Sequence, residues 1–240
     1  MPGTLHLGTS GFAYPEWKGV FYPEDSKPRD MLPYFASRFR SVEINYTFRR
    51  HPSEKTLSSW REQTPEGFTF TLKAHQNITH RHRLADAHEP VKFFIERARV
   101  LGDRIGVVLF QCPPSLRFDR ALLEDFLATL PGDGRFAMEF RHSSWEDSRE
   151  LLAEHGVAWC TAETDEQPAG RDSWEPFGYL RLRKETYAED DLKAWAERVE
   201  PALEAGHDVY CYFKHEEKGI GPAYALRLAE LLAPSPTASP

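Results

Sequence analysis

The sequence predicts a single-domain α/β protein with a TIM-barrel-like (β/α)8 fold. Eight short apolar segments have the length and composition of strands, and most are followed by a segment with helical character. The chain has 240 residues, close to the ~250 that such a barrel usually has. No linker rich in Pro, Gly or Ser and no short repeat divides the chain, so one domain is expected over residues 1–232.

The alternative fold is an open doubly wound sheet. Such a sheet commonly carries a G-x-G-x-x-G turn after its first strand, where it binds the phosphates of a dinucleotide. Here the first predicted strand ends in Gly8-Thr-Ser-Gly11, which does not match that pattern. The barrel is therefore favoured.

The first half of the chain supplies four predicted strands, at residues 5–11, 41–45, 68–73 and 105–110. Residues 68–73 alternate in polarity as a strand does, and residues 105–110 are nearly all apolar, which is typical of a parallel strand buried on both faces. Helices are expected at about residues 29–38, from Pro52 through Trp60, at residues 90–101 and at residues 119–130.

The second half continues the alternation. Strands are expected from Phe136 onward and at residues 157–161, 177–182 and 208–213, with helices near residues 146–155, 189–204 and 222–232. The last residues, 233–240, are small and Pro-rich. They have nothing to bury, which predicts a disordered C-terminal tail.

Composition restricts the classes of partner. The formal net charge of −7 gives no general sign of nucleic-acid or anionic-membrane binding, so any anion site must be local. No segment approaches roughly 18 consecutive apolar residues, and the N-terminus has no signal-peptide pattern. Cys112, Cys160 and Cys211 form no C-x-x-C pair and indicate buried thiols in a reducing compartment. A cytoplasmic protein without a membrane partner is expected.

Several short motifs follow one another along the chain. They are Gly8-Thr-Ser-Gly11 with Trp17, Phe21-Tyr-Pro23, Val42-Glu-Ile-Asn45, Thr79-His80, Gln111 with Pro113-Pro114, Glu139-Phe-Arg141 with Ser144-Trp145, and Tyr179-Leu-Arg181. As a set they resemble the YecE-like family, domain of unknown function 72, over about residues 5–232. The resemblance implies a TIM-barrel-like fold and brings no established activity with it.

Two segments depart from the family's pattern. Leu182-Arg183-Lys184 stands where relatives commonly have Leu-His-Gly, and Phe213-Lys214-His215 stands where they commonly have Phe-Asn-Asn. Both segments fall at strand ends, where a site is expected. Substrate or activity could therefore differ from that of relatives.

Polar residues gather at the carboxyl ends of the predicted strands, where barrels of this type hold their active sites. After Phe136, strand alternation puts Glu139 and Arg141 on the face opposite Phe140. The candidate site residues are Trp17, Glu43, Asn45, Lys73, His80, Gln111, Glu139, Arg141, Arg181 and His215. A structural ion-pair network is the alternative, although desolvated charges are a poor source of stability.

Two carboxylates among cations permit acid–base chemistry, because a Glu beside Arg stays ionised whereas a desolvated Glu can donate a proton. Glu139 and Glu43 are therefore the predicted catalytic residues. The predicted binding residues are Lys73, Arg141 and Arg181 for negative charge, with Asn45 and Gln111 to orient the ligand.

The segment from Gly67 to Ala85 forms a local cationic patch. It contains no acidic residue and holds Lys73, His75, His80, Arg81, His82 and Arg83. Arg and Lys suit phosphate, although a solvated loop that pairs with the acidic residues after it is the alternative. Trp17 offers a ring that stacks on a sugar or base, or else one that caps the barrel.

No cofactor is expected. Ten histidines lie among many carboxylates, so a divalent metal site is an alternative, but the chain has no H-E-x-x-H motif and no cysteine pair with ligand spacing. Ser10 and Ser144 lack the G-x-S-x-G setting of a hydrolase nucleophile. Cys112 is expected to be an inert thiol.

The sequence therefore predicts an enzyme of the hydrolase or lyase type that acts on a small anionic, phosphate-bearing or sugar-containing ligand. Nucleic acid is a specific version of this expectation, because a basic loop beside aromatic residues suits a phosphate backbone. The alternative is a non-catalytic barrel that binds a nucleotide, nucleic acid or a protein partner.

Overall fold

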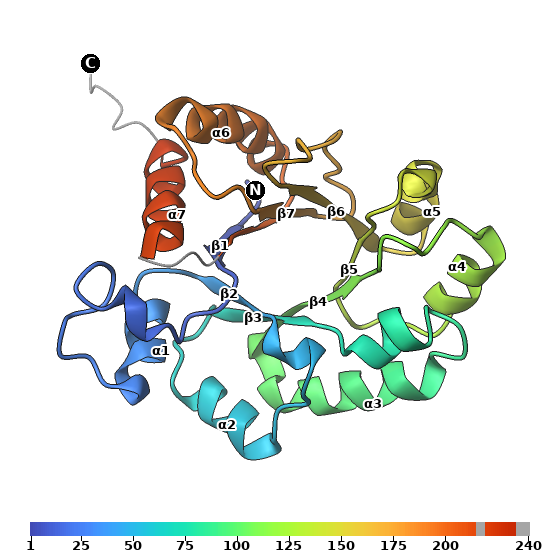
Figure 1. Ribbon diagram of the computed structural model, residues 1–240, viewed down its shortest axis with the longest axis horizontal. Coiled ribbons are helices and arrows are strands. Elements are labelled where there is room, and N and C mark those ends of the chain that lie inside the picture. The colour runs from blue at the N-terminus through green and yellow to red at the C-terminus, as the bar shows by residue number, and fades with distance from the viewer. Residues whose placement is uncertain (215–218, 234–240) are drawn as a thin grey trace.

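A parallel eight-stranded sheet forms the centre of the protein (Figure 1). The computed structural model describes residues 1–214 and 219–233; His215 and residues 234–240 of the predicted tail lie outside them. The strands are β1 (Leu5–Thr9), β2 (Ser41–Ile44), β3 (Thr69–Lys73), β4 (Ile105–Gln111), β5 (Phe136–Glu139), β6 (Val157–Glu163), β7 (Gly178–Leu182) and β8 (Val209–Phe213). Their order is β1-β8-β7-β6-β5-β4-β3-β2, and each pairs in parallel. The predicted (β/α)8 barrel is confirmed.

The barrel closes between β1 and β2. The amide of Gly11 donates a hydrogen bond of 2.7 Å to the carbonyl oxygen of Glu43, and Ser10 forms a parallel bridge with Glu43. A Cβ atom on Gly8 would lie 1.9 Å from the carbonyl oxygen of Ser41. The two strands therefore approach closely because the residue at position 8 has no side chain.

The helices surround the strands (Figure 1). They are α1 (Pro28–Ala36), α2 (Glu54–Glu62), α3 (His88–Ala98), α4 (Arg120–Leu127), α5 (Arg149–Glu154), α6 (Glu189–Glu204) and α7 (Ile220–Leu231). β6 and β7 are joined by residues 164–177, all described, without a helix. None of the helices in the described residues combines the length and apolar character that a membrane crossing needs.

Local signals set several helix boundaries. Ser53 and Asp119 cap α2 and α4, each accepting a 3.1 Å hydrogen bond from the amide three residues later. The predicted helix at residues 90–101 is shorter than expected, because α3 gives way to a 3-10 segment in which Gly102 has φ 57°. The predicted helix at residues 146–155 is a 3-10 turn followed by the short α5.

Two apolar regions stabilise the barrel. One lies between the strands and the helices. The other fills the barrel interior and consists of Val107, Leu109, Ala137, Ala158, Cys160, Phe177, Tyr179, Tyr210 and Tyr212. The Tyr212 hydroxyl lies 2.7 Å from the hydroxyls of both Ser41 and Thr71, so this polar group is satisfied inside the barrel.

Candidate functional site

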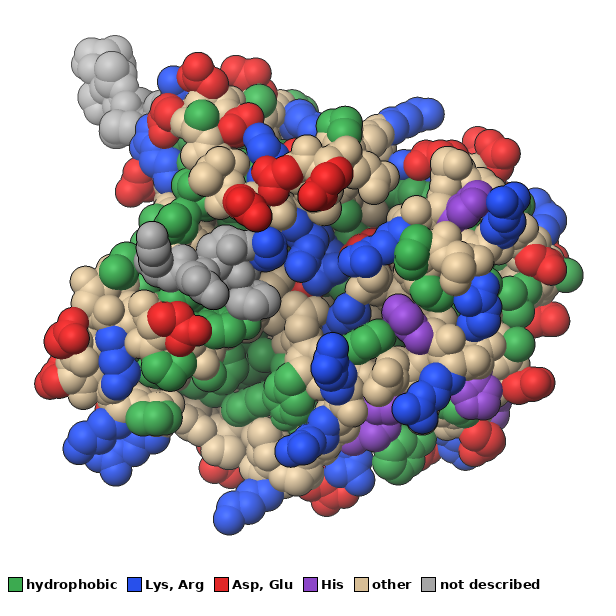
Figure 2. Space-filling view, viewed as in Figure 1, with side chains coloured by type: hydrophobic (Ala, Val, Ile, Leu, Met, Phe, Trp, Pro, Cys, Tyr) green, Lys and Arg blue, Asp and Glu red, His purple; other side chains and the backbone are tan. Residues whose placement is uncertain are grey.

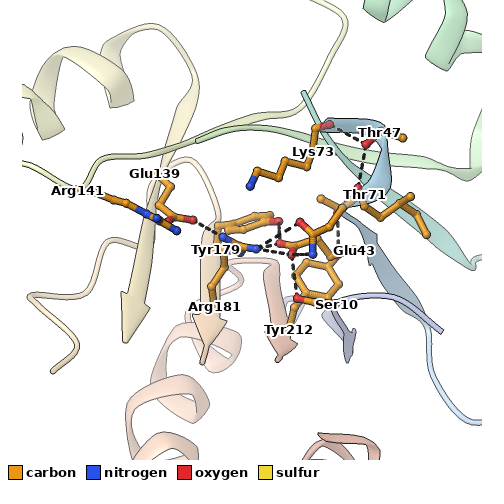
Figure 3. Close-up of polar contacts among 12 residues, drawn as sticks. Ser10, Glu43, Thr47, Thr71, Lys73, Glu139, Arg141, Tyr179, Arg181 and Tyr212 are labelled. Carbon is orange, nitrogen blue, oxygen red and sulfur yellow. Dashed lines mark hydrogen bonds and ion pairs between the residues drawn. The ribbon is translucent and has the colours of Figure 1, made fainter. Parts of the chain in front are cut away.

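A buried arginine lies at the centre of the polar end of the barrel (Figure 3). Arg181, on β7, is 2% exposed. Its guanidinium donates to both carboxylate oxygens of Glu43, at 2.9 and 2.7 Å, and to Oε2 of Glu139 at 2.5 Å. Burial opposes the charge, but the two carboxylates hold the pKa of Arg181 well above its usual value. One side chain therefore connects β7 with β2 and β5.

Glu43 is enclosed and saturated with hydrogen bonds. It has no exposed surface. Besides its two bonds from Arg181, it accepts from Ser10 at 2.9 Å, from Asn45 at 3.0 Å and from Tyr179 at 2.7 Å. Burial alone would raise its pKa, but the charge and hydrogen bonds of Arg181 outweigh this effect and lower the pKa to about 2. Glu43 is thus a permanent carboxylate that fixes Arg181.

Glu139 has the more open position of the two carboxylates. Its Oε1 accepts from Nε of Arg141 at 3.1 Å, while its Oε2 is held by Arg181. Burial opposes ionisation, but the charges of Arg181 and Arg141 lower the pKa of Glu139 below its usual range. Unlike Glu43, it lines a cavity.

The cavity opens where β5 and β6 separate. Their ladder ends at the pair of Met138 and Trp159, although β6 continues beside β7 to Glu163. The volume is about 260 Å³, and the lining includes Glu139, Arg141, Thr161, Arg171 and Arg183. Lys and Arg side chains gather near the middle of the molecular face seen in Figure 2.

Two buried polar atoms at this cavity have no hydrogen-bond partner among the described residues. They are Nη1 of Arg183 and Oγ1 of Thr161. Buried polar groups are normally paired, because an unsatisfied one destabilises a protein by about 1–3 kcal/mol. A donor and a hydroxyl left in this state beside a cavity indicate a place for a ligand or for water.

The cluster carries an excess of positive charge. Four cationic groups, those of Lys73, Arg141, Arg181 and Arg183, act on the two carboxylates, which leaves a formal excess of two positive charges. Burial lowers the pKa of Arg183, and the neighbouring Arg181 lowers it further. In a protein of net charge −7, this local excess favours an anionic ligand.

Lys73 and His80 lie on one aromatic ring. The amine of Lys73 is 4.3 Å from the centre of the Phe48 ring, and the His80 ring packs against it at 4.8 Å. Burial and then the charge of Arg181 lower the pKa of Lys73 to about 8. Burial, Lys73 and Arg141 lower the pKa of His80 as well.

The basic loop after β3 has an unusual backbone. Arg83, Leu84 and Asp86 have φ values of 53°, 72° and 46°, a left-handed region that costs a residue with a side chain about 1–3 kcal/mol. Arg83 donates to the hydroxyl and carbonyl oxygens of Ser115, at 3.0 and 2.9 Å. The loop is therefore held against the segment that follows β4.

The remaining predicted residues occupy different positions. Asn45 contacts Glu43 and accepts from Arg181 at 3.4 Å, and the buried Gln111 pairs in register with Glu139. Trp17 has no exposed surface and packs against neighbouring tyrosine rings, so in this conformation it offers no face for stacking. His215 lies outside the described residues.

Sequence reasoning did not identify Ser10 and Tyr179 as partners of Glu43. Both residues belong to motifs of the family resemblance, and Ser10 lacks the setting of a hydrolase nucleophile. Alternation along β7 places Tyr179, Arg181 and Arg183 on one face, and that pattern was the available signal for Tyr179 and Arg183. Within the described part of the chain, no group of three or more His, Cys, Asp or Glu residues is placed to hold a metal ion.

Known proteins match both the sequence and the fold. The sequence pattern of the family "Protein of unknown function DUF72" matches residues 6–240. A crystal structure of a DUF72 family protein from Thermotoga maritima superposes with a TM-score of 0.81 and 28% identity, covering 96% of this chain and all of that one.

Two curated relatives share parts of the sequence. The UPF0759 protein YecE of Escherichia coli strain K12 is 29% identical over 139 residues, which are 58% of this chain and 48% of YecE. The match therefore spans about half the length of that relative. The UPF0759 protein YunF of Bacillus subtilis strain 168 is 22% identical over 273 aligned residues, covering 95% of this chain and 94% of YunF.

Proposed function

The chain belongs to the family of proteins of unknown function DUF72, and we propose that it is an enzyme of the hydrolase or lyase type that acts on an anionic, phosphate- or sugar-containing ligand. The reaction takes place at the carboxyl end of the barrel, where enzymes of this fold hold their active sites.

The observation that supports this proposal is the local excess of positive charge beside the cavity. A structural network would balance its charges, because an uncompensated buried cation is strongly destabilising. Here Arg183 keeps a buried nitrogen without a partner among the described residues, next to the carboxylate of Glu139. An anionic group of the ligand would accept that hydrogen bond and neutralise the cluster.

The geometry supports different roles for the two predicted carboxylates. Glu139 lines the cavity and serves as the acid–base group that exchanges a proton with the ligand or with water. Glu43 has no access to the cavity lining and serves as a positioning residue, because it fixes Arg181, which in turn orients Glu139.

The binding residues surround Glu139. Arg141 and Arg183 bind the anionic group, and Arg141 is 44% exposed at its side chain, so it can reach a ligand that enters the cavity. Gln111 and Asn45 orient the ligand from β4 and from the end of β2. Lys73 contributes positive charge from the end of β3, and the neutral imidazole of His80 offers a hydrogen bond beside it.

Nucleic acid is a larger ligand with the same phosphate chemistry. The basic loop after β3 places Arg83 and His80 beside the site, where they could contact a phosphate backbone. The three free and buried cysteines support a reducing, cytoplasmic setting for this activity. A non-catalytic binding barrel is the second candidate. It is favoured by one observation, that arginines hold both carboxylates in their ionised form.

A ligand screen followed by a turnover assay tests the proposal. Purified protein is screened by thermal shift against sugar phosphates, nucleotides and oligonucleotides, and each ligand that stabilises it is then assayed for turnover. Glu139→Gln should lower turnover by about 10²–10⁴-fold while ligand binding persists. Glu62→Gln, on the exposed end of α2, serves as the matched control.

Ligand binding without turnover in the parent protein would favour the binding barrel. No binding across the panel, or equal turnover in Glu139→Gln and the parent, would contradict the enzyme with Glu139 as its acid–base group.

A further inference from the structure

Lys73, the last residue of β3, presents its amine inside the charged cluster without a direct polar partner. Among the described residues, no hydrogen bond or ion pair reaches this amine, and its nearest recorded contact is the Phe48 ring at 4.3 Å. Figure 3 shows the side chain pointing into the space between Glu139 and Glu43. The two carboxylates form their ion pairs with arginines instead.

The surroundings of Lys73 increase the share of its neutral form. Burial is the largest effect, and the cations Arg181 and Arg141 add to it, while Glu139 and Glu43 oppose it. His80 approaches the same Phe48 ring from η3 (Asn77–Arg81). With a pKa of about 8, roughly a tenth of Lys73 is the free amine at pH 7, against about 0.03% at the usual 10.5.

We propose that Lys73 is a nucleophile that forms an imine with the carbonyl group of an anionic aldehyde or ketone. The inference rests on the proposed function, which supplies the anion site, and it narrows the substrate class to carbonyl compounds. An amine beside cations and partly withdrawn from water is the setting in which lysines form Schiff bases.

The chemistry is balanced within the site. The Lys73 ammonium group releases one proton, and the lone pair of the resulting amine adds to the carbonyl carbon. The carbonyl oxygen takes up that proton and a second one from the attacking nitrogen, the C–O bond breaks, and the oxygen leaves as water. The product is a protonated C=N bond. When a C–H bond beside it breaks, the electron pair moves toward the iminium nitrogen to give an enamine, and Glu139 accepts the proton. The anionic group of the substrate lies against Arg183 and Arg141.

Reductive trapping tests the inference on the full chain. The protein is incubated at pH 7 with glyceraldehyde 3-phosphate and sodium cyanoborohydride, which reduces an imine to a stable amine. Intact-mass analysis and peptide mapping then locate the adduct. We expect a single adduct on Lys73, formed at least about tenfold faster than on any other lysine. Lys73→Arg should lose it, whereas Lys55→Arg, an exposed change on α2, should keep it.

Two matched compounds separate this inference from the proposed function. Glyceraldehyde lacks the anion and should label Lys73 more slowly, and glycerol 3-phosphate lacks the carbonyl and should protect Lys73. Suppose that glycerol 3-phosphate raises the melting temperature of the protein but the aldehyde adducts are spread evenly over surface lysines. This result would contradict the imine on Lys73 and would still support the anion site. Equal labelling by both aldehydes without protection would support the nucleophile and contradict the anion site.

Discussion

The guanidinium of Arg181 holds both carboxylate oxygens of Glu43, at 2.7 and 2.9 Å, although the two residues are 138 positions apart. β7 and β2 are not neighbours in the sheet, so this pair crosses the inside of the barrel. The same arginine reaches Glu139 on β5. Arg181 therefore supports the candidate site and links strands that share no ladder.

Replacing Arg181 should reverse the response of stability to acid. Arg181→Met leaves Glu43 and Glu139 buried without this cation, which should lower the free energy of unfolding at pH 7 by about 3–5 kcal/mol. Burial then raises the pKa of Glu43, which has no other ion-pair partner among the described residues, so the folded variant binds protons more readily than its unfolded chain. Urea unfolding should show that the variant gains stability from pH 7 to pH 5. A constant difference from the parent over that range would contradict this account.

Replacing Glu43 should flatten the acid response. The pKa of Glu43 is about 2 in the folded protein against a usual 4.5, so its contribution is present above pH 4.5 and is lost as the pH falls toward 2. Glu43→Gln should be less stable at pH 7 by about 3–5 kcal/mol and should lose less stability across that acid window than the parent does. Glu62→Gln is the control, and a Glu43→Gln curve parallel to that of the parent would refute the assignment.

The alternation of side chains along single strands explains which part of this network could be predicted from the sequence. Alternation along a strand places Glu139 with Arg141, and Tyr179 with Arg181, because the side-chain period of a strand is two. The same pattern cannot say that Arg181 reaches Glu43 rather than another acidic residue, because that contact depends on how eight strands close. Nor does it show that Trp17 is fully buried or that β5 and β6 separate above Met138, since both depend on tertiary packing.

The buried charge of Lys73 should lower the free energy of unfolding at pH 7. Because its folded pKa of about 8 is below the usual 10.5, the folded protein releases this proton first, and stability from this group rises between pH 8 and 10.5. Lys73→Met should therefore raise the free energy of unfolding at pH 7 by on the order of 1–3 kcal/mol. Chemical denaturation at pH 7 and pH 9 measures this gain, which should shrink at the higher pH. Lys55→Met is the matched control, and destabilisation by Lys73→Met at pH 7 would count against the lowered pKa.

The closure of the barrel should depend on glycine at position 8, which has no side chain. In Gly8→Ala the new Cβ would lie 1.9 Å from the carbonyl oxygen of Ser41, so β1 and β2 must move apart. We expect a loss of about 1–3 kcal/mol or more, as overpacking commonly gives. Gly132→Ala is the control, because nothing lies within 4 Å of its Cβ position. Equal melting temperatures for the two variants would show that the strands close in another way.

Thermal unfolding in increasing inorganic phosphate, with chloride at matched ionic strength, tests the central claim most directly. A ligand at a hundred times its Kd stabilises the folded state by about 2.7 kcal/mol, and each kcal/mol raises Tm by roughly 2–4 °C at this size. The parent protein and Arg227→Gln, an exposed change on α7, should show such a rise, and Arg183→Gln should lose most of it. An equal rise in Arg183→Gln, or no rise in the parent, would contradict an anion site at the carboxyl end of the barrel.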